Sequence, residues 1–231
     1  MRAVALLSGG LDSVVATAAS AREHELALAL TCDYGQLAAA QEIAAARQVA
    51  ATLGIPHRLV SLSWLAEITR TALVSREAPI PQASPEALDD PEAAAQVAAA
   101  VWVPNRNGLF LNIAAAYCET LEAGAIVCGF NAEEGASFPD NTPGFMLAAE
   151  RCFAFSTQRG LRVLSPTVNL TKPEIVRLGY EIGAPLPLVW SCYRGGAEHC
   201  WQCPSCLRLR RALQQAGYWE QWQEERAVAQ P

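Results

Sequence analysis

The 231-residue chain has room for one α/β domain of ordinary size with a small appendage, but not for a second full domain such as a fused glutaminase. Its net charge of −6 is the opposite of the basic surface that grips a nucleic-acid backbone, so the composition favours a small-molecule substrate. No apolar run is long enough to cross a bilayer or to act as a signal peptide. We therefore expect a cytoplasmic protein whose eight cysteines are thiols or metal ligands.

The N-terminal third of the chain alternates short apolar runs with helix-compatible stretches. Strands are expected at residues 2–7, 26–32 and 57–62, and helices at 12–21 and 36–53. This alternation is typical of βαβ units. It predicts an α/β fold with a doubly wound, Rossmann-like parallel sheet.

Residues 75–103 interrupt the alternation, because an Ala-rich piece is bracketed there by Pro79, Pro81, Pro85, Pro91 and Pro104. We interpret this segment as a long excursion over the sheet and as a candidate lid. The alternation resumes with a helix at 108–121 and a strand at 125–129. A loop at 131–143 then leads into a helix that ends near residue 158.

A capping box marks the start of the next helix, with Thr171 as the N-cap and Glu174 three residues later. After residue 188 the composition becomes rich in Cys and Gly, and it ends in a predicted helix at 207–215 and a tail that contains Trp219 and Trp222. We expect a catalytic domain at 1–188 and a small C-terminal metal-binding segment at 189–231 packed on the same domain.

The loop SGGLDS at residues 8–13 joins the first strand to the first helix. Backbone N–H groups and the positive end of the helix dipole favour an anion at such a position. Gly9 and Gly10 allow a close approach, Ser8 and Ser13 add hydroxyl donors, and Asp12 can orient Mg²⁺. The pattern is neither GxxxxGK[ST] nor GxGxxG, so it predicts a polyphosphate site that belongs to neither of those two classes.

Lys172 is the only lysine among 17 basic residues, and it begins the helix that the capping box predicts. Its ammonium can reach a phosphate as a point charge, although a first-turn position is electrostatically poor for a cation. A solvated lysine explains the position about equally well on site chemistry alone. The retention of one Lys in an Arg-rich chain favours a functional role.

Four cysteines near the C-terminus have the spacing C-x7-C-x2-C-x2-C, and they are Cys192, Cys200, Cys203 and Cys206. This pattern predicts a closed tetrahedral Zn²⁺ site with a structural role, because four protein ligands leave no open position. Two alternatives remain: an iron–sulfur cluster, and a site in which His199 replaces one Cys. The other four cysteines lie in apolar stretches and are expected to be buried thiols.

The loop at 8–13 resembles the pyrophosphatase loop SGGxDS of the PP-loop adenine-nucleotide α-hydrolase superfamily, whose members form an adenylate and release pyrophosphate. Nearly the whole chain resembles the 7-cyano-7-deazaguanine synthase family. The motifs that carry this resemblance are LLSGGLDSVVA at 6–16, DYGQ at 33–36, VPNRNGLFLNIAAAYCE at 103–119, GFNAEEGASFPDN at 129–141, SPTVNLTKPEIVRLG at 165–179, and SCY and HCWQCPSCLRLRRAL at 191–193 and 199–213. One departure is PDNT at 139–142, where many members of the family read PDCR.

The resemblance implies an ATP-dependent ligase that forms AMP and pyrophosphate and uses ATP, Mg²⁺ and Zn²⁺. It would adenylate 7-carboxy-7-deazaguanine, let ammonia displace AMP to give the amide, and use a second ATP to dehydrate the amide to the nitrile preQ0, a queuosine precursor. Its partners would be these small molecules, without direct nucleic acid or membrane contact, and a homodimer stays open.

Site residues follow from the loop and from these motifs. The catalytic candidates are Asp12, Ser13, Lys172 and Arg106. The candidates for binding ATP are Ser8, Gly9, Gly10, Leu11, Asp12, Ser13, Val14, Val15, Ala16, Thr17 and Ala18. The candidates for binding the acid are Tyr34, Arg106, Glu133, Phe138 and Asp140, with Glu134 as a further carboxylate that could accept from a guanine-like edge. Arg106 could bind either the substrate carboxylate or a transition-state phosphate.

Two rival functions remain open. A tRNA sulfurtransferase of the same superfamily would need a basic surface for tRNA, which the acidic charge disfavours. A regulatory module that only binds ATP would need neither the SGGLDS loop nor a metal site.

Overall fold

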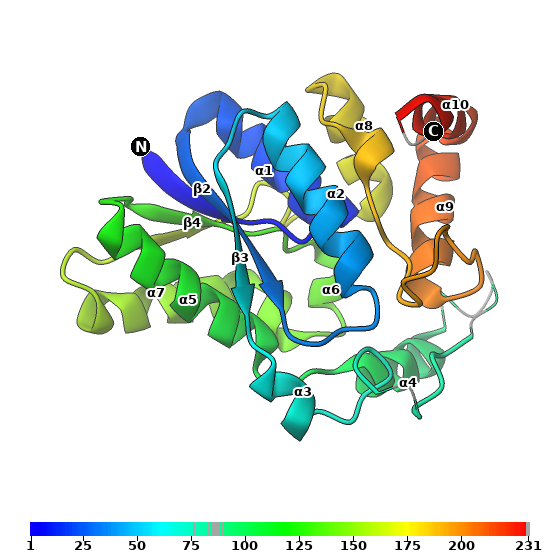
Figure 1. The fold of residues 1–231 in the computed structure, drawn as a ribbon, viewed down its shortest axis with the longest axis horizontal. Coiled ribbons are helices and arrows are strands. Elements are labelled where there is room, and N and C mark those ends of the chain that lie inside the picture. Colours follow the sequence, from blue (N-terminus) through cyan, green and yellow to red (C-terminus); the bar gives the residue numbers. More distant parts are fainter. Residues whose placement is uncertain (76, 83, 85–87, 89, 230–231) are drawn as a thin grey trace.

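Five parallel strands form one sheet in the computed structural model, which describes residues 1–231 except 76, 83, 85–87, 89, 230 and 231. The strand order is β3-β2-β1-β4-β5, with β1 at Arg2–Leu6, β2 at Glu25–Asp33, β3 at His57–Ser61, β4 at Ala125–Val127 and β5 at Arg162–Leu164 (Figure 1). The chain runs outward from β1 to β3 and then returns to the other side of β1. Open α/β sheets bind ligands where the order reverses in this way, here between the carboxyl ends of β1 and β4.

Helices cover both faces of the sheet (Figure 1). On one face lie α1 (Leu11–Glu23), α2 (Ala39–Thr52) and α8 (Lys172–Glu181), and on the other lie α5 (Arg106–Thr120) and α7 (Pro143–Ser156). Successive side chains of β1 point to opposite faces, so Ala3 and Ala5 pack with α1 and α2 while Val4 packs with α5. Because β1 is covered on both sides, its sequence is continuously apolar from Ala3 to Leu6 rather than alternating.

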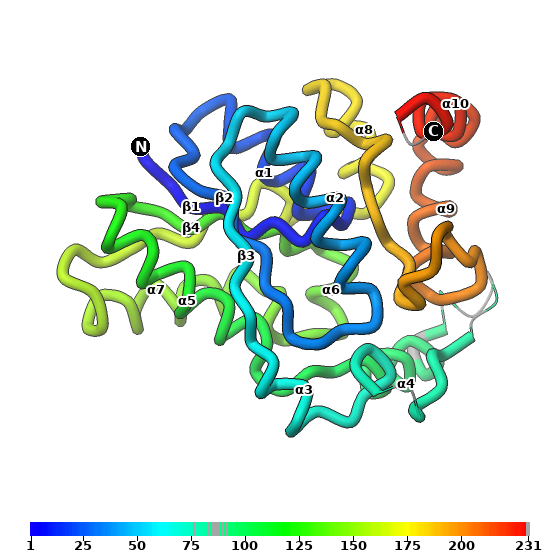
Figure 2. The backbone as a smooth tube through the Cα atoms, in the orientation of Figure 1, coloured from blue at the N-terminus to red at the C-terminus, as the bar shows by residue number. Residues whose placement is uncertain are grey.

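The remaining elements lie at the carboxyl ends of the strands or beside α8. Beyond the ends of β2 and β3 lie α3 (Trp64–Ile68) and α4 (Pro91–Val101), as the backbone tube in Figure 2 shows. Two short turns, α6 (Ala132–Gly135) and the 3₁₀ turn η2 (Pro139–Asn141), follow β4. The 3₁₀ turn η3 (Leu186–Leu188) leads to α9 (Pro204–Ala216) and α10 (Trp219–Ala229), and α9 packs against α8. No helix of the described chain is long and apolar enough to cross a membrane.

The predicted α/β fold with a parallel, doubly wound sheet is confirmed. Several elements differ from the prediction. Strand β5 was not predicted, because three residues carry no readable period, and α6 lies within the segment predicted as a loop. The tail after residue 217 forms α10, whose Trp222 is fully buried. The predicted excursion at 75–103 contains α4, and its residues 76, 83, 85–87 and 89, Pro85 among them, lie outside the described residues.

Candidate functional site

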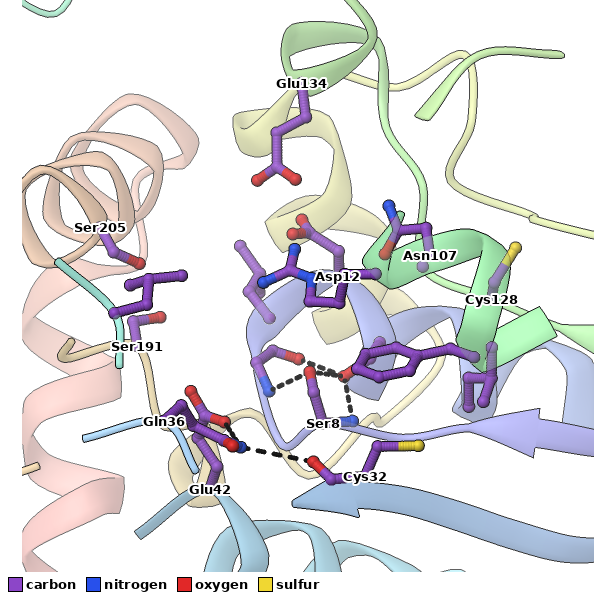
Figure 3. Close-up of a pocket in the computed structure, with 18 of the residues that line it drawn as sticks. Ser8, Asp12, Cys32, Gln36, Glu42, Asn107, Cys128, Glu134, Ser191 and Ser205 are labelled. Atoms are coloured by element: carbon purple, nitrogen blue, oxygen red, sulfur yellow. Dashed lines mark hydrogen bonds between the residues drawn. The ribbon is translucent and has the colours of Figure 1, made fainter. Parts of the chain in front are cut away.

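A cavity of about 270 Å³ opens at the carboxyl ends of β1, β2 and β4, where the strand order reverses. Its walls come from the loop after β1, from α6, and from the first turns of α5 and α9. In Figure 3, Ser8 and Asp12 lie near its centre and Glu134 points toward Asp12 from α6. Gln36 and Glu42 form another side of the same cavity. Polar side chains that are distant in sequence therefore converge on one space.

The loop between β1 and α1 is held from several directions. Gly9 has a φ of +83°, and a Cβ there would lie 2.8 Å from the carbonyl oxygen of Glu42, so only glycine fits between the loop and α2. The Ser13 hydroxyl donates to the carbonyl of Gly10 at 3.0 Å and accepts from the backbone N–H of Ser8 at 3.2 Å. No side chain caps α1 at Gly10, so the positive end of this helix faces the cavity and is free for an anion.

Lys172 reaches this helix end from the start of α8. Its Nζ donates to Asp12 Oδ2 at 2.6 Å and to Glu134 Oε1 at 2.7 Å. The Lys172 side chain is 11% exposed and that of Asp12 is 15% exposed, so the pair is largely shielded from water. One ammonium and two carboxylates thus form a charged cluster beside the free N-terminus of α1.

Burial and charge act in opposite directions in this cluster. Burial raises the pKa of Asp12 to about 6, although the Lys172 ammonium opposes the shift. Burial would also raise the pKa of Glu134, but Lys172, with Arg208 and Arg106, holds that pKa below its usual value. The two carboxylates raise the pKa of Lys172 against the effect of burial. Asp12 Oδ1 is buried without a hydrogen-bond partner among the described residues, so one carboxylate oxygen is left for a ligand.

Arg106 enters the cavity from the first turn of α5. This turn follows Asn105, which has a left-handed φ of 52°, and both Arg106 and Asn107 line the cavity. The Arg106 guanidinium donates to the Tyr34 hydroxyl at 3.2 Å and lies 5.7 Å from the centre of the same ring. Burial raises the pKa of Tyr34 to about 12, which keeps its hydroxyl protonated at neutral pH. Arg106 is therefore fixed by an uncharged partner and keeps its full positive charge for a ligand.

The other residues predicted to bind the acid occupy different positions. Phe138 lines the cavity and stacks on Trp102, with ring centroids 6.0 Å apart, and Asp140 also lines the cavity. Burial raises the pKa of Asp140. Glu133 does not line the cavity. It accepts from the backbone N–H of Lys172 at 2.7 Å and lies 3.7 Å from Arg211, so its contacts bind α6 to α8 and α9.

Of the residues predicted to bind ATP, some line the cavity and others lie away from it. Ser8, Gly10, Leu11, Asp12 and Ser13 line the cavity. Gly9 is turned toward α2, and Val14, Val15, Ala16, Thr17 and Ala18 are buried inside α1. They lie away from the cavity because α1 is enclosed between the sheet and α8, and most of its residues serve the core.

Sequence reasoning missed several lining residues, among them Glu42, Asn107, Ser191, Ser205 and Arg208. Glu42 is the only acidic residue in α2, a signal that could have been read, and it accepts from Gln36 Nε2 at 2.8 Å. Gln36 itself lies in the DYGQ motif but was not assigned a role. Burial raises the pKa of Glu42, which makes it a group with an unusual environment in the cavity wall.

The four predicted metal ligands gather at the N-terminus of α9. The Sγ atoms of Cys192, Cys200, Cys203 and Cys206 all lie within 4.8 Å of one another. Four sulfurs bound to one zinc ion at ~2.3 Å would be roughly 3.8 Å apart, so the gathering is compact enough for a single tetrahedral ion. A multi-iron cluster would hold its sulfurs farther apart. These cysteines could therefore hold one metal ion.

His199 lies beside this cluster but uses its ring differently. Its Nε2 accepts from the backbone N–H of Ser191 at 3.1 Å, and its ring packs between Trp190 and Trp201. Burial lowers the pKa of His199 to about 4, so the imidazole is neutral. The alternative in which His199 replaces a cysteine ligand is not supported by this arrangement.

The C-terminal elements also support the loop between β1 and α1. The backbone N–H of Trp190 donates to the carbonyl of Gly9 at 2.9 Å. Arg226 of α10 donates to the carbonyls of Pro187 and Val189 at 3.1 and 2.8 Å, and Trp222 donates to that of Leu186 at 2.9 Å. The last helix therefore holds the segment that contacts the first loop of the chain.

Comparisons with known proteins place the chain in a family. The family model of the queuosine biosynthesis protein QueC matches residues 2–217. The 7-cyano-7-deazaguanine synthase of Desulforudis audaxviator (strain MP104C) is 52% identical over 217 residues, which cover 94% of this chain and 98% of that protein. The protein of the same name from Pelotomaculum thermopropionicum is 51% identical, with the same coverage. Among solved structures, a 4-thiouridine synthetase in complex with RNA and ATP has a TM-score of 0.48 and 21% identity, and the match covers 98% of this chain and 53% of that chain.

Proposed function

The chain belongs to the family of the queuosine biosynthesis protein QueC, and we therefore propose that it converts 7-carboxy-7-deazaguanine and ammonia to 7-cyano-7-deazaguanine (preQ0) at the expense of ATP. The relatives that carry the synthase name match over almost their whole length. The observation that carries the proposal within the fold is the cluster of Lys172, Asp12 and Glu134 at the free N-terminus of α1. This arrangement suits a polyphosphate whose α-phosphate is attacked.

The proposed reaction has two activations at one site. The substrate carboxylate attacks the α-phosphate of ATP, the bond between the α-phosphorus and its bridging oxygen breaks, and pyrophosphate leaves with the electron pair. Ammonia then attacks the acyl carbon, AMP leaves, and one proton is released to give the amide. The amide oxygen attacks the α-phosphate of a second ATP, and a second pyrophosphate leaves with the electron pair of the broken bond. Loss of AMP and of both amide protons then yields the nitrile. Both adenylates must be shielded from water, which their position within the cavity favours.

We assign the phosphates of ATP to the residues around the start of α1. Ser8, Gly10 and Ser13 offer backbone and hydroxyl donors, and Lys172 supplies positive charge. Asp12 and Glu134 would hold Mg²⁺, since the buried, unpaired Oδ1 of Asp12 is a suitable oxygen ligand. When bound, this ion would neutralise the phosphates.

We assign the acid to the side of the cavity formed by α5 and η2. Arg106 would bind the carboxylate with a planar pair of N–H donors, because its own partner Tyr34 is uncharged. Asp140 would accept from the two adjacent N–H groups of the deazaguanine edge, and Phe138 would stack on the ring. The contacts of Glu133 with α8 and α9 favour a positioning role for it instead.

The four cysteines would hold Zn²⁺, with a structural role because no ligand position is left open. The ion would fix the start of α9 and the loop before it, so we treat 189–231 as a segment that completes the catalytic domain at 1–188. We further propose that the protein acts in the cytoplasm, where these thiols stay reduced.

The test is incubation with 7-carboxy-7-deazaguanine, ATP, Mg²⁺ and ammonium, followed by mass spectrometry. We expect the nitrile, with the amide as an intermediate and with AMP and pyrophosphate as products. Formation of neither nitrile nor amide would contradict the proposal. A brown protein with visible absorption would favour the tRNA sulfurtransferase instead, and ATP binding without pyrophosphate release would favour the regulatory module.

A further inference from the structure

A second cavity, of about 940 Å³, adjoins the first beside the charged cluster. Trp102, Glu134, Phe138, Lys172 and Arg208 line both cavities. The outer walls of the second cavity come from α4 and from α8 and α9. The two cavities therefore share the cations Lys172 and Arg208, which lie beside the N-terminus of α1.

Arg208 differs from the two neighbouring arginines on α9. The Arg210 guanidinium lies over the ring of Trp219 at 5.3 Å, and that of Arg211 lies 3.7 Å from Glu133. Within the described part of the chain, Arg208 makes no hydrogen bond or ion pair, yet it is half-buried and faces the cavity. It lies close enough to Glu134 to help lower the pKa of that carboxyl. Its charge is thus available to a ligand.

The start of α9 determines where Arg208 points. Cys203 is the N-cap of this helix, and Cys206 lies in its first turn, two residues before Arg208. Both belong to the metal-binding cluster. An ion held there would fix the first turn of α9 and, through it, the direction of the Arg208 side chain.

Pyrophosphate is the most highly charged species that leaves the proposed reaction. Lys172 is already shared by two carboxylates, and Arg106 lies against Tyr34 on the wall assigned to the acid. A guanidinium can hold two phosphate oxygens at once. Arg208 lines both cavities, as Lys172 does, but it makes no hydrogen bond or ion pair with a carboxylate among the described residues.

We propose that Arg208 binds the β- and γ-phosphates of ATP, and that pyrophosphate leaves through the second cavity past this residue. The inference rests on the proposed function. The bond that breaks joins the α-phosphorus to the oxygen bridging to the β-phosphorus, and Arg208 stabilises the charge that develops on the leaving pyrophosphate.

The test compares Arg208→Gln with Arg210→Gln, which removes a charge from the same helix at an exposed position. Calorimetry would measure pyrophosphate binding in the presence of Mg²⁺, and kinetics would measure the KM values for ATP and for the acid. Arg208→Gln should weaken pyrophosphate binding by about 10- to 100-fold and raise the KM for ATP. The KM for the acid and the zinc content should stay unchanged, and Arg210→Gln should match the unsubstituted protein.

Pyrophosphate binding by Arg208→Gln that equals that of Arg210→Gln, in a protein that makes the nitrile, would overturn the inference and leave the proposed function intact. If the unsubstituted protein makes no nitrile but Arg208→Gln loses pyrophosphate binding, the proposed function is overturned and the role of Arg208 in binding pyrophosphate is supported. If Arg208→Gln loses zinc, the pyrophosphate affinity of a second variant, Arg208→Lys, tests the inference instead. It keeps the charge without the planar fork, so it must still bind pyrophosphate more weakly than the unsubstituted protein. Equal binding would overturn the inference.

Discussion

The Nζ atom of Lys172 lies 2.6 Å from Oδ2 of Asp12, although 160 residues separate them in the chain. The contact joins the first turn of α1 to the first turn of α8. Lys172 is held in place by the helix start that the capping box of Thr171 and Glu174 defines. A lysine at the positive end of one helix is thus stabilised by carboxylates at the ends of two others.

Lys172→Met tests this cluster, because it leaves two largely buried carboxylates without their shared cation. We expect loss of about 3–5 kcal/mol of stability and a fall of at least roughly 100-fold in nitrile formation. Urea unfolding and a product assay would measure the two effects.

Arg159→Met is the matched control, since its pair with Glu122 spans 3.8 Å and both side chains are 73% exposed. Its effect on stability should be about 0–1 kcal/mol. Equal effects of the two substitutions would contradict the assignment of Lys172.

Gly9→Ala tests the fit of the loop between β1 and α1 against α2. The left-handed backbone would cost roughly 1–3 kcal/mol, and the new Cβ would also press on the backbone of α2, so we expect a higher KM for ATP. Gly54→Ala has a similar φ of +68°, but no atom lies within 4 Å of its Cβ position. It should lower the melting temperature and leave the KM for ATP unchanged. A raised KM in both variants would mean that strain alone explains the effect.

Arg106→Gln should weaken binding of the acid and leave binding of the phosphates unchanged. We expect the KM for 7-carboxy-7-deazaguanine to rise by about 10- to 100-fold while pyrophosphate binding stays unchanged. Tyr34→Phe removes only the 3.2 Å hydrogen bond to Arg106, so its effect should be smaller, near ~1 kcal/mol. Weakened pyrophosphate binding in Arg106→Gln would assign this arginine to the phosphates.

The raised pKa of Tyr34 predicts that the stability of the protein depends on pH in the alkaline range. Burial raises its pKa to about 12, whereas an unfolded tyrosine titrates near 10. The folded state therefore favours the protonated phenol, and this contribution to stability is present below about pH 10 and is lost as the pH rises toward 12. The difference in tyrosinate absorbance between the unsubstituted protein and Tyr34→Phe should remain absent up to about pH 11. A midpoint near pH 10 would show that the phenol is in contact with water.

Cys203→Ser should remove the metal and destabilise the C-terminal segment by several kcal/mol, because binding energy at such a site contributes to folding. Native mass spectrometry would report the zinc, and limited proteolysis would report the loosened segment. Cys152→Ser is the control and should change neither. Cys152 was expected to be a buried thiol, but it is exposed on α7. Retention of both zinc and protease resistance in Cys203→Ser would refute the structural role.

The parts of the site that a single short motif encodes could be predicted from the sequence. Ser8, Asp12 and Ser13 line the cavity because strand, loop and helix follow one another without interruption. The spacing of the four cysteines likewise predicted their meeting. Lys172 stands out in the sequence by its rarity, and it contacts Asp12 at the cavity.

Other positions in the site depend on tertiary packing, which local sequence patterns do not predict. Glu133 and Glu134 are neighbours in sequence, yet the short turn α6 directs one to α8 and the other to the cavity. Glu42 reaches the cavity because Gly9 lets α2 approach the loop closely. In the sequence, residues 14–18 continue the loop motif. In the fold they are buried in the core, because the sheet and α8 cover α1.

The hydrogen bond from Trp190 to Gly9 couples the first loop of the cavity to a segment that is distant in sequence. Ser8 and Asp12 form one wall of the cavity, and Ser191, Ser205 and Arg208 form another. A folding intermediate that has formed the sheet but has not docked the segment after α8 therefore lacks one wall of the cavity. Ligand binding at this loop and docking of the C-terminal helices should thus stabilise each other.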